Sequence, residues 1–363
     1  MQRRSLIAGA AVVASVSAPA IAQSTPNVRW RMPSSFPKSL DTVFGGAVAI
    51  SNIVKNLTDG RFTITPFGAG ELLPPLAILD GVQSRSVECG HTAGFYYVGK
   101  EPALAFDTGI PFGMTPRQHT AWMQHGGGMT TMREIYERFD AVQIPCGNTG
   151  AQMGGWFRKE IKSVQDFKGL RMRVPGLLGR VYAKLGVTPL QLPAADVYPA
   201  LEKGTLDAVE FVGPYDDEKL GLAKVARFYY GPGVMELGAS LCFIANKKAW
   251  AELPDSYRAA LEAACAQANA DMLAKYDVNN VPALKRLVGG GARLSYWSKP
   301  ILDALHQATG EVLKEESATN PVFASVHQKW RSFLDEQLIW SSVNDGAAEQ
   351  YMLGTRRSPT VLR

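Results

Sequence analysis

The sequence predicts an α/β protein of two similar lobes, followed by a helical C-terminal region. Three observations predict this architecture. The chain has 363 residues, about twice the usual size of a single domain. Helix and strand signals alternate along its first two thirds. One pattern of helix end, turn and strand occurs in both halves of that region.

The composition is that of an ordinary globular protein. Apolar residues make up 46% of the chain and charged residues 20%, which argues against extensive disorder. The net charge is +5 and the basic residues are scattered, so nucleic acid is not expected as a partner. No apolar run reaches the ~18–20 residues that a membrane-spanning helix needs.

Residues 1–22 read as an export signal. Arg3-Arg4 supply the positive start, an apolar stretch follows, and Ala20-Ile21-Ala22 fits an A-x-A cleavage site. We therefore expect the mature protein in the periplasm after cleavage. The paired arginines resemble a twin-arginine signal, while the Sec route stays open. The alternative reading is a buried N-terminal helix.

The first lobe begins with a helix from Thr42 to Leu57, where apolar residues recur every three or four positions. Asp59-Gly60 ends it, and Arg61–Thr65 alternates like a strand. A helix opened by Pro74-Pro75 and a strand at 87–90 follow. This alternation predicts a mainly parallel sheet.

The second lobe repeats the same alternation of strand and helix. The predicted elements, in order, are a strand at 170–174, a helix at 178–185, a strand at 187–190, a helix at 194–203 closed by Gly204, and a strand at 206–212.

The two lobes share a local pattern at 82–88 and 201–207, which supports two similar half-structures. Ligands of open α/β sheets bind beyond the carboxyl ends of the strands. If the lobes face one another, residues 91–97 and 210–217 line the cleft between them.

The third region is helical. Residues 254–287 form one long helix or two nearly collinear ones, because Pro282 is the single internal breaker. Further helices are expected at 301–316 and 322–339. The last of these is rich in aromatic residues, and it packs either on its own chain or on a partner subunit.

The four cysteines give no metal or disulfide framework. Cys89, Cys146, Cys242 and Cys265 lie far apart, without metal-ligand spacing. The periplasm permits disulfides, but a chain of this length does not need them, so no pairing is predicted.

Motifs of the common enzyme classes are absent from the sequence. It has no P-loop, no H-E-x-x-H and no G-x-S-x-G. The glycines at 68–70 and 126–128 read as turns, and the five histidines lack ligand spacing. His91 either meets a ligand or is structural. These observations count against an enzyme without excluding one.

Binding chemistry concentrates between Asn148 and Phe157. Asn148 and Gln152 offer amides, the glycines allow close backbone approach, and Trp156 can wall off an apolar pocket. A glycine-containing strand with core aromatics is the alternative reading of the same residues.

Arg173 and Glu210 are charges within apolar strands. Arg173 needs a partner there, which is either a ligand carboxylate held by two guanidinium nitrogens or an internal salt bridge. Glu210 is surrounded by apolar residues and invites a cation. Its partner is Arg173, or a metal ion held with the Gln152 amide oxygen and a backbone carbonyl.

At these residues the chain resembles the extracytoplasmic solute-binding receptors of TRAP transporters, the DctP-like family. The resemblance covers nearly the whole mature chain. Its most specific parts are Gln152–Phe157, Gly169–Gly176 and Glu210–Asp217. The last block resembles the branch that binds 2-oxo acids such as pyruvate together with a cation, sodium by analogy, with calcium as the alternative.

The resemblance implies a periplasmic-binding-protein-like fold in which a long helix spans two lobes that close on the ligand. It implies a signal peptide at 1–22, a first lobe at 23–147 and 237–285, and a second lobe at 148–236. Residues 286–363 would be C-terminal helices that exchange between the subunits of a homodimer. The implied partners are a small monocarboxylate and the membrane subunits of a TRAP transporter.

The resemblance also assigns site residues. Arg173 would grip the ligand carboxylate, and Gln152, Glu210 and the Phe211 carbonyl would hold the cation. This chain has Phe211 where the branch usually has Trp, so the preferred side-chain length of the ligand stays open. Lesser assignments are Asn148 and Tyr96 as hydrogen-bond donors, Phe95 and Trp156 as further ligand contacts, and Glu236 as a cation ligand.

The sequence thus predicts a periplasmic receptor for a 2-oxo monocarboxylate, without catalytic activity. A receptor for lactate or a larger carboxylate is the alternative within the class. An exported enzyme that uses the cation as a Lewis acid is the alternative outside it. A sensor's ligand domain is the third reading, weakened because no output module is attached.

Overall fold

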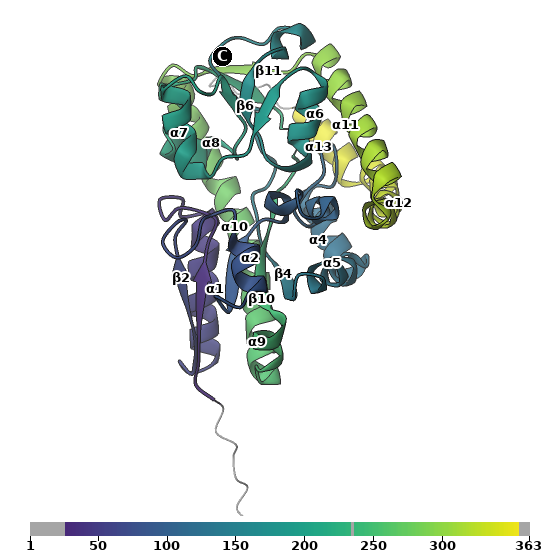
Figure 1. Cartoon of the computed structure of the whole chain (residues 1–363). Helices are drawn as coiled ribbons and strands as arrows, with labels where there is room; N and C mark the ends of the chain where they lie inside the picture. Colours follow the sequence, from purple (N-terminus) through teal and green to yellow (C-terminus); the bar gives the residue numbers. More distant parts are fainter. Residues whose placement is uncertain (1–25, 234–235, 356–363) are drawn as a thin grey trace, which may run out of the picture.

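Two α/β lobes lie one above the other in Figure 1, with the long helix α10 running behind both. The computed structural model describes residues 26–233 and 236–355. The predicted signal peptide at 1–22 lies outside these residues.

The sheet of the first lobe contains five strands in the order β2-β1-β3-β10-β4, with an isolated bridge between Ser34 and His91 joining β1 to β3. Its strands are β1 (Val28–Pro33), β2 (Phe62–Phe67), β3 (Cys89–Thr92), β4 (Ala141–Asn148) and β10 (Ser240–Asn246). Its helices are α1 (Val43–Leu57), α2 (Ile78–Gln83), α3 (Ala105–Thr108), α4 (Pro116–His125), α5 (Gly128–Glu137) and α9 (Lys247–Ala251).

The sheet of the second lobe has the order β11-β9-β5-β8-β6-β7. Its strands are β5 (Gly155–Phe157), β6 (Arg171–Arg173), β7 (Thr188–Leu190), β8 (Ala208–Val209), β9 (Phe228–Gly231) and β11 (Arg293–Tyr296). Its helices are α6 (Gly176–Lys184), α7 (Ala194–Glu202) and α8 (Pro214–Lys219).

Each sheet is parallel except for one reversed strand. In the first lobe β10 is antiparallel to both neighbours, and in the second lobe β5 is. These two strands follow the points where the chain crosses between lobes, after β4 and after β9. Since β4 and β9 each leave their lobe at the carboxyl end, the carboxyl ends of the parallel strands face the other lobe. The predicted mainly parallel sheets are therefore confirmed.

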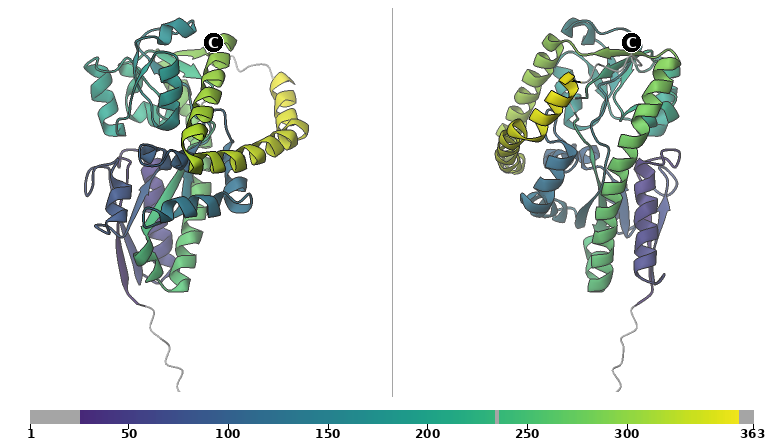
Figure 2. Two further views of the ribbon diagram at one scale, coloured as in Figure 1. Left: turned by 45° about the vertical axis from the view of Figure 1, so that its right-hand side comes forward. Right: turned by 180° about the vertical axis from the view of Figure 1, so that it is seen from behind.

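A single helix, α10 (Asp255–Gly289, 35 residues), connects the lobes along the back of the molecule (Figure 2, right). It contacts α1 and β4 of the first lobe and α8 of the second. Pro282 lies inside the helix without ending it, so the single long helix is the correct reading of the two that the sequence left open.

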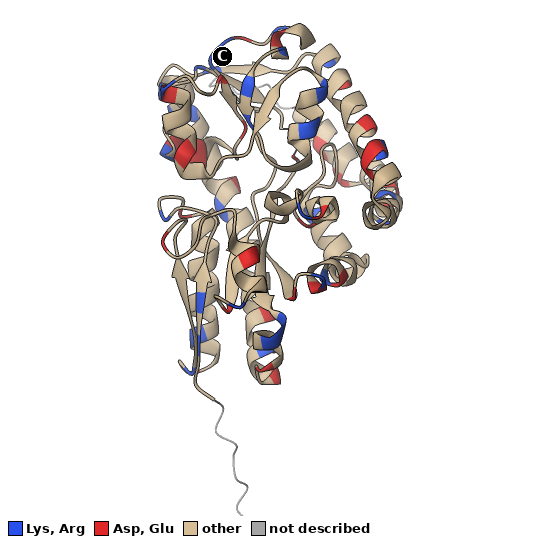
Figure 3. Ribbon diagram, in the orientation of Figure 1, with Lys and Arg blue, Asp and Glu red and all other residues tan. Residues whose placement is uncertain are grey.

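The C-terminal helices form an arm across both lobes, made of α11 (Lys299–Thr319), α12 (Pro321–Val343) and α13 (Asp345–Thr355). The helix α11 packs on α6, where Arg180 pairs with Glu316 and Lys184 with Glu315. Figure 3 shows the basic bands of α6 beside the acidic bands of α11. The helix α12 then crosses to the first lobe (Figure 2, left).

Three predicted elements differ from the structure. The second helix starts at Ile78 rather than at Pro74, because Pro74–Ala77 form a turn closed by the Ala77 N–H donating to the Pro74 carbonyl. The strand expected at 206–212 is shortened to β8. The strand β11 lies within 286–363, which the sequence assigned to C-terminal helices, yet it pairs with β9 in the second sheet.

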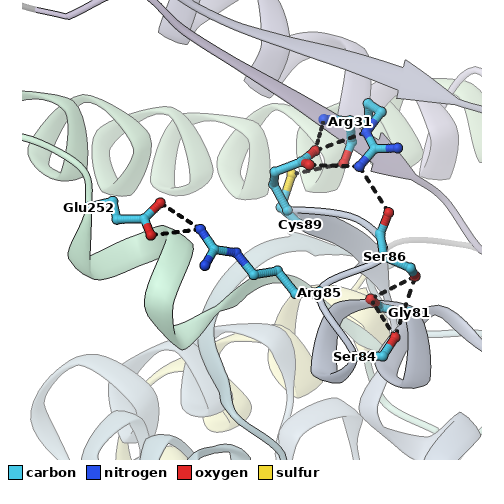
Figure 4. A network of polar contacts seen from close by, with 8 residues as sticks. Arg31, Gly81, Ser84, Arg85, Ser86, Cys89 and Glu252 are labelled. Atoms are coloured by element: carbon cyan, nitrogen blue, oxygen red, sulfur yellow. Dashed lines mark hydrogen bonds and ion pairs between the residues drawn. The ribbon is translucent and has the colours of Figure 1, made fainter.

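Ion pairs fix the end of the first lobe that lies away from the second. Arg31 on β1 donates to Glu88 at 2.7 Å and to the Ser86 carbonyl at 2.9 Å, and Arg85 pairs with Glu252 beyond α9 (Figure 4). These contacts tie the loop before β3 to its neighbours.

All four cysteines are buried and unpaired. Burial raises the pKa of each thiol, so all four are held in the unreactive protonated form.

Within the described residues, no helix is both long and apolar enough to cross a membrane.

Candidate functional site

A cluster of buried polar side chains lies where the two lobes meet. Its members come from the ends of β6 and β8, from the crossing between β4 and β5, and from the segment between β9 and β10. These are the edges at which the parallel strands of each lobe point toward the other lobe. The site therefore forms where the topology of α/β sheets leads us to expect one.

Arg173 ends β6 and is only 2% exposed. Its Nη1 donates to the Glu210 carbonyl at 2.6 Å, and its Nε donates to the Leu192 carbonyl at 3.2 Å. The guanidinium carbon lies 5.2 Å from the centre of the Phe211 ring, at cation–π distance. Backbone carbonyls thus fix the direction of the guanidinium without neutralising its charge.

The internal salt bridge that the sequence offered as an alternative is loose. Arg173 Nη1 lies 3.9 Å from Glu210 Oε2, beyond hydrogen-bond distance. Glu210 Oε2 is fully buried and has no hydrogen-bond partner in the described residues. Such a carboxylate is costly unless a cation or a proton compensates it.

The Gln152 amide faces the same carboxylate. Its tip lies 2.6 Å from Glu210 Oε1 and 3.0 Å from the Phe211 carbonyl oxygen. With the amide nitrogen on this side, Gln152 donates to both oxygens and accepts from the Thr149 hydroxyl. With the amide oxygen on this side, three oxygens converge on one point and the nitrogen donates to Thr149 Oγ1 at 3.0 Å. One side chain therefore satisfies this corner with or without a cation.

Two buried glutamates share this corner. Glu236 is held beside Gln152, whose backbone N–H donates to the Glu236 carbonyl at 3.1 Å. Burial raises the pKa of Glu210 well above its ordinary range; Glu236 adds to the rise and Arg173 opposes it. Burial also raises the pKa of Glu236, to about 7, again against the effect of Arg173. One guanidinium cannot balance two carboxylates, so the corner favours an added positive charge.

The donor set fits a hard cation. The described residues contain no group of three or more His, Cys, Asp or Glu side chains able to hold a metal. Here a single carboxylate combines with an amide oxygen and a backbone carbonyl, the oxygen ligands that sodium and calcium accept.

The first lobe contributes Phe95 and Tyr96. Burial raises the pKa of the Tyr96 hydroxyl, and Arg173 beside it opposes part of that rise. The backbone carbonyl of Tyr96 accepts from Gln191 Nε2 of the second lobe at 3.1 Å. Phe95 abuts Gly176, where an added Cβ would lie 2.9 Å from the Cβ of Phe95. Both predicted residues therefore lie at the lobe interface.

Asn148 ends β4 at the crossing between lobes and is buried. Its side-chain oxygen accepts from the Gly150 N–H at 2.9 Å, which shapes the turn before Gln152. Its proposed donation to a ligand stays a prediction.

Trp156 packs within the second lobe, and its contact with a ligand stays a prediction. Its side chain is fully buried in the second lobe, stacked on Tyr229 at 3.9 Å between ring centres, and its Nε1 donates to Asp217 at 2.9 Å. The alternative reading, a core aromatic in a glycine-containing strand, describes these contacts.

His91 is structural rather than a ligand residue. It is fully buried in β3, its Nδ1 lies 3.0 Å from the Ser34 hydroxyl, and its ring meets Phe36 edge-on. Burial lowers its pKa to about 3, so it stays neutral at neutral pH.

Sequence reasoning missed two participants, Leu192 and Thr149. Leu192 acts through its backbone carbonyl, which no side-chain pattern reveals. Thr149 lies inside the Asn148–Phe157 segment, and its hydroxyl alongside Gln152 was the available signal.

The site is closed to solvent. A cavity of only about 10 Å³ adjoins it, room for about one water molecule. Its lining joins Phe95, Gly109 and Pro111 of the first lobe to Glu236 and to residues 175–178 of the second. An organic acid can reach Arg173 only after the lobes separate.

Comparison with known proteins identifies the family. Residues 34–320 match the family described as bacterial extracellular solute-binding protein, family 7, known as DctP. A monocarboxylate 2-oxoacid-binding periplasmic protein of Nostoc sp. is 45% identical over 360 residues, covering 97% of this chain and 99% of the relative.

Solved structures of TRAP transporter solute-binding proteins are similar to this chain over most of its length. A TRAP transporter solute-binding protein from Bordetella bronchiseptica, a mixed-occupancy dimer with calcium and picolinate, has a TM-score of 0.90 and 48% identity over 91% of this chain and 98% of its own. One from Colwellia psychrerythraea, with calcium and pyruvate, has a TM-score of 0.86 and 35% identity over 90% and 99%. One from Pseudoalteromonas atlantica, with sodium and pyruvate, has a TM-score of 0.86 and 36% identity over 91% and 100%.

The match covers both lobes and the long helix between them, and the most similar proteins share more than a third of their residues with this chain. The chain therefore belongs to the DctP family of bacterial extracellular solute-binding proteins.

Proposed function

We propose that this protein is the receptor of a TRAP transporter and binds a small 2-oxo monocarboxylate together with a cation. The observation that carries the proposal is the convergence of the Gln152 amide, Glu210 Oε1 and the Phe211 carbonyl beside the buried Arg173. The relatives that bind pyruvate with calcium or sodium support it.

The chemistry of a 2-oxo acid matches this arrangement. Arg173 neutralises the ligand carboxylate through charge-assisted hydrogen bonds. A keto oxygen beside a carboxylate oxygen offers two more ligands to a cation held by Gln152, Glu210 and Phe211. Acetate lacks the keto oxygen, so the site favours 2-oxo acids over simple fatty acids. Tyr96 and Asn148 serve as further donors, Phe95 as an apolar wall, and Glu236 as a nearby counter-charge.

Sodium and calcium differ in how they balance the site. Arg173 supplies one positive charge, while Glu210, Glu236 and the ligand supply three negative ones when both glutamates are ionised. Calcium completes the balance, whereas sodium does so only with one proton retained. We propose that the site accepts both ions, with sodium as the ion of the 2-oxo acid branch.

We propose that the protein is exported and that it delivers its bound ligand to the transporter. Cleavage after residue 22, by the twin-arginine-like or the Sec route, would release the mature chain into the periplasm. The closed, loaded receptor then delivers its ligand to the membrane subunits. A receptor tuned to lactate or a larger carboxylate is the alternative, and we assign no catalytic step.

We also propose that the C-terminal helices make a homodimer. None of the residues of α13 is buried, although Tyr351, Met352 and Leu353 are apolar. A cavity of about 650 Å³ separates α13 from α4 and α10, so α13 does not pack tightly on its own chain. Exposed apolar patches of this kind mark interaction surfaces.

Thermal unfolding tests the ligand assignment. The ligand-stripped mature protein would be heated with pyruvate, longer 2-oxo acids, lactate and acetate, each with sodium, with calcium and after chelation. A ligand at about 100 times its dissociation constant stabilises the folded state by roughly 2.7 kcal/mol. We expect stabilisation by 2-oxo acids that requires a cation, and none by acetate. Equal responses to pyruvate and acetate would reject the chelate geometry.

The variant Glu210→Gln tests the shared site. We expect weaker binding of both the cation and the acid, because the two are reciprocally linked. The exposed Glu202→Gln on α7 is the control and should bind both normally. Loss of one ligand alone would show that the two do not share a site.

A further inference from the structure

We propose that Thr42 and Asp216 form a latch between the lobes, and that this latch sets the affinity of the receptor from outside the binding site. The inference rests on the proposed function in one respect, since it assumes that ligand binding accompanies lobe closure.

The latch is a buried hydrogen-bond network. The Thr42 hydroxyl donates to Asp216 Oδ1 at 2.6 Å, and the Tyr276 hydroxyl donates to Asp216 Oδ2 at 2.5 Å. Thr42 is 2% exposed and the other two side chains are completely buried. Each carboxylate oxygen of Asp216 thus has its own donor, as burial of a carboxylate requires.

The Thr42 hydroxyl does not cap the helix that follows it. Thr42 is the residue before α1, a position where threonine commonly accepts a hydrogen bond from the first turn of its own helix. Here no such bond forms. The hydroxyl is directed instead to Asp216, 174 residues away in the sequence. Its removal therefore does not uncap α1.

The two partners belong to different lobes. Thr42 is attached to α1, which packs on β2 in the first lobe, and Asp216 lies in α8 of the second. The helix α10, which carries Tyr276, contacts both α1 and α8. Separation of the lobes breaks the Thr42 bond and leaves Asp216 with one donor, so the bond contributes only to the closed state.

The latch is joined directly to the binding corner. Asp216 lies six residues after Glu210 on the segment that leaves β8. The next residue, Asp217, accepts from Trp156 Nε1 at 2.9 Å and from the Tyr229 hydroxyl at 2.7 Å inside the second lobe. Asp216 thus anchors this segment to the first lobe, and Asp217 anchors it to the second. Glu210 and Phe211, which face the proposed cation, lie on the same segment.

A second, exposed contact lies at the rim of this interface. Asp41 pairs with Lys219 and accepts from the Tyr215 hydroxyl at 3.2 Å. Because Asp41 is largely exposed, this pair contributes little to closure. It provides the matched control for the buried bond.

The test compares Thr42→Val, Thr42→Ser and Asp41→Asn in the mature protein. Spin labels at Lys55→Cys and Lys203→Cys, both exposed, would report the distance between the lobes, because the four native cysteines are buried. Affinity for pyruvate with calcium would be measured by calorimetry. Losing a hydrogen bond to a buried carboxylate should weaken binding about tenfold or more in Thr42→Val.

We expect Thr42→Val to show a smaller closed fraction and weaker pyruvate binding, with unchanged unfolding of the ligand-free protein. Thr42→Ser should restore both, and Asp41→Asn should match the parent. Thr42→Ala repeats the test if valine disturbs packing. Equal closed fractions in parent and Thr42→Val, with and without pyruvate, would overturn the latch. If pyruvate does not change the closed fraction of the parent, yet Thr42→Val lowers that fraction, the ligand assignment is wrong and the latch is still supported.

Discussion

Arg173 is the residue on which carboxylate binding depends. Its guanidinium is oriented by two backbone carbonyls and keeps its charge for a ligand. We expect Arg173→Ala to weaken 2-oxo acid binding by at least about 100-fold, the effect of losing two charge-assisted hydrogen bonds. Calorimetric titration with pyruvate measures it, and Arg173→Lys tests whether charge without the forked geometry suffices.

Arg171 is the matched control on the same strand. It points to the surface of the second lobe and pairs with Asp207 at 2.9 Å. Arg171→Ala should bind pyruvate like the parent. Near-parental affinity in Arg173→Ala would remove Arg173 from the site.

Asp107 makes stability depend on pH in the first lobe. Burial raises its pKa to about 6, although Tyr136 and Gln143 donate to it at 2.8 and 2.5 Å. Between its ordinary pKa of 3.8 and about 6, the folded state binds more protons than the unfolded chain. The free energy of unfolding therefore falls as pH rises through this range, by up to about 3 kcal/mol, and then levels off.

The variant Asp107→Asn isolates this effect. The new amide has no proton to lose, and the unpaired Gln143 Oε1 can accept from its nitrogen. Urea unfolding at pH 4.5 and 7.5 should show a smaller loss of stability in the variant than in the parent. The same loss in both proteins would assign the pH dependence to other groups.

At the scale of single residues, the sequence showed which charged residues need a partner more reliably than it showed what each site residue does. Arg173 and Glu210 stood out because charges inside apolar strands require partners, and the structure brings them together. The role of Trp156 stayed open because a large aromatic residue beside glycines is compatible with a pocket and with a core. Leu192 was invisible because it acts through its backbone.

The helix α12 shows how one element attaches the C-terminal arm to the first lobe. Trp330 is 2% exposed and lies 5.6 Å from the Phe106 ring, whereas Trp340 on the same helix is 52% exposed. We expect Trp330→Ala to lower the free energy of unfolding by about 3–5 kcal/mol, because it leaves a cavity. Trp340→Ala should change it by less than about 0.5 kcal/mol in the monomer. Urea denaturation of both variants measures the contrast.

Helices were predicted more fully than strands. The helices at α1, α7, α11 and α12 follow local periodicity, and their observed bounds lie close to the predicted ones. The strands β4, β9 and β10 were not predicted. Their partners lie as far as 156 residues away, as between Ala245 and Cys89, and local pattern does not show which strand completes a sheet across that distance.

The C-terminal arm of the molecule ends in an exposed apolar surface that includes Ile339 and Leu353. If this surface forms the dimer, Ile339→Glu combined with Leu353→Glu should convert dimer to monomer and leave pyruvate binding intact. Light scattering after size-exclusion chromatography measures the mass. Leu57→Glu, an exposed apolar residue of the first lobe, is the control. A dimer that persists in the double variant would place the interface elsewhere.

The two-lobe design was predictable at this scale, because a repeated local pattern implies repeated architecture. Lobe closure was expected only from the family resemblance, and the contact between Thr42 and Asp216 was not expected, because it joins residues 174 positions apart. The exact lobe boundaries stay a prediction except at β11, which the structure assigns to the second sheet.

The central position of β10 has a consequence for biosynthesis. This strand separates β3 from β4 in the first sheet, yet it is made only after five of the six strands of the second lobe, β5 to β9. A nascent chain that ends before Ser240 therefore has two strands of that sheet with no partner between them. The first lobe therefore cannot complete its sheet until β10 has emerged from the ribosome, after about two thirds of the chain has been synthesised.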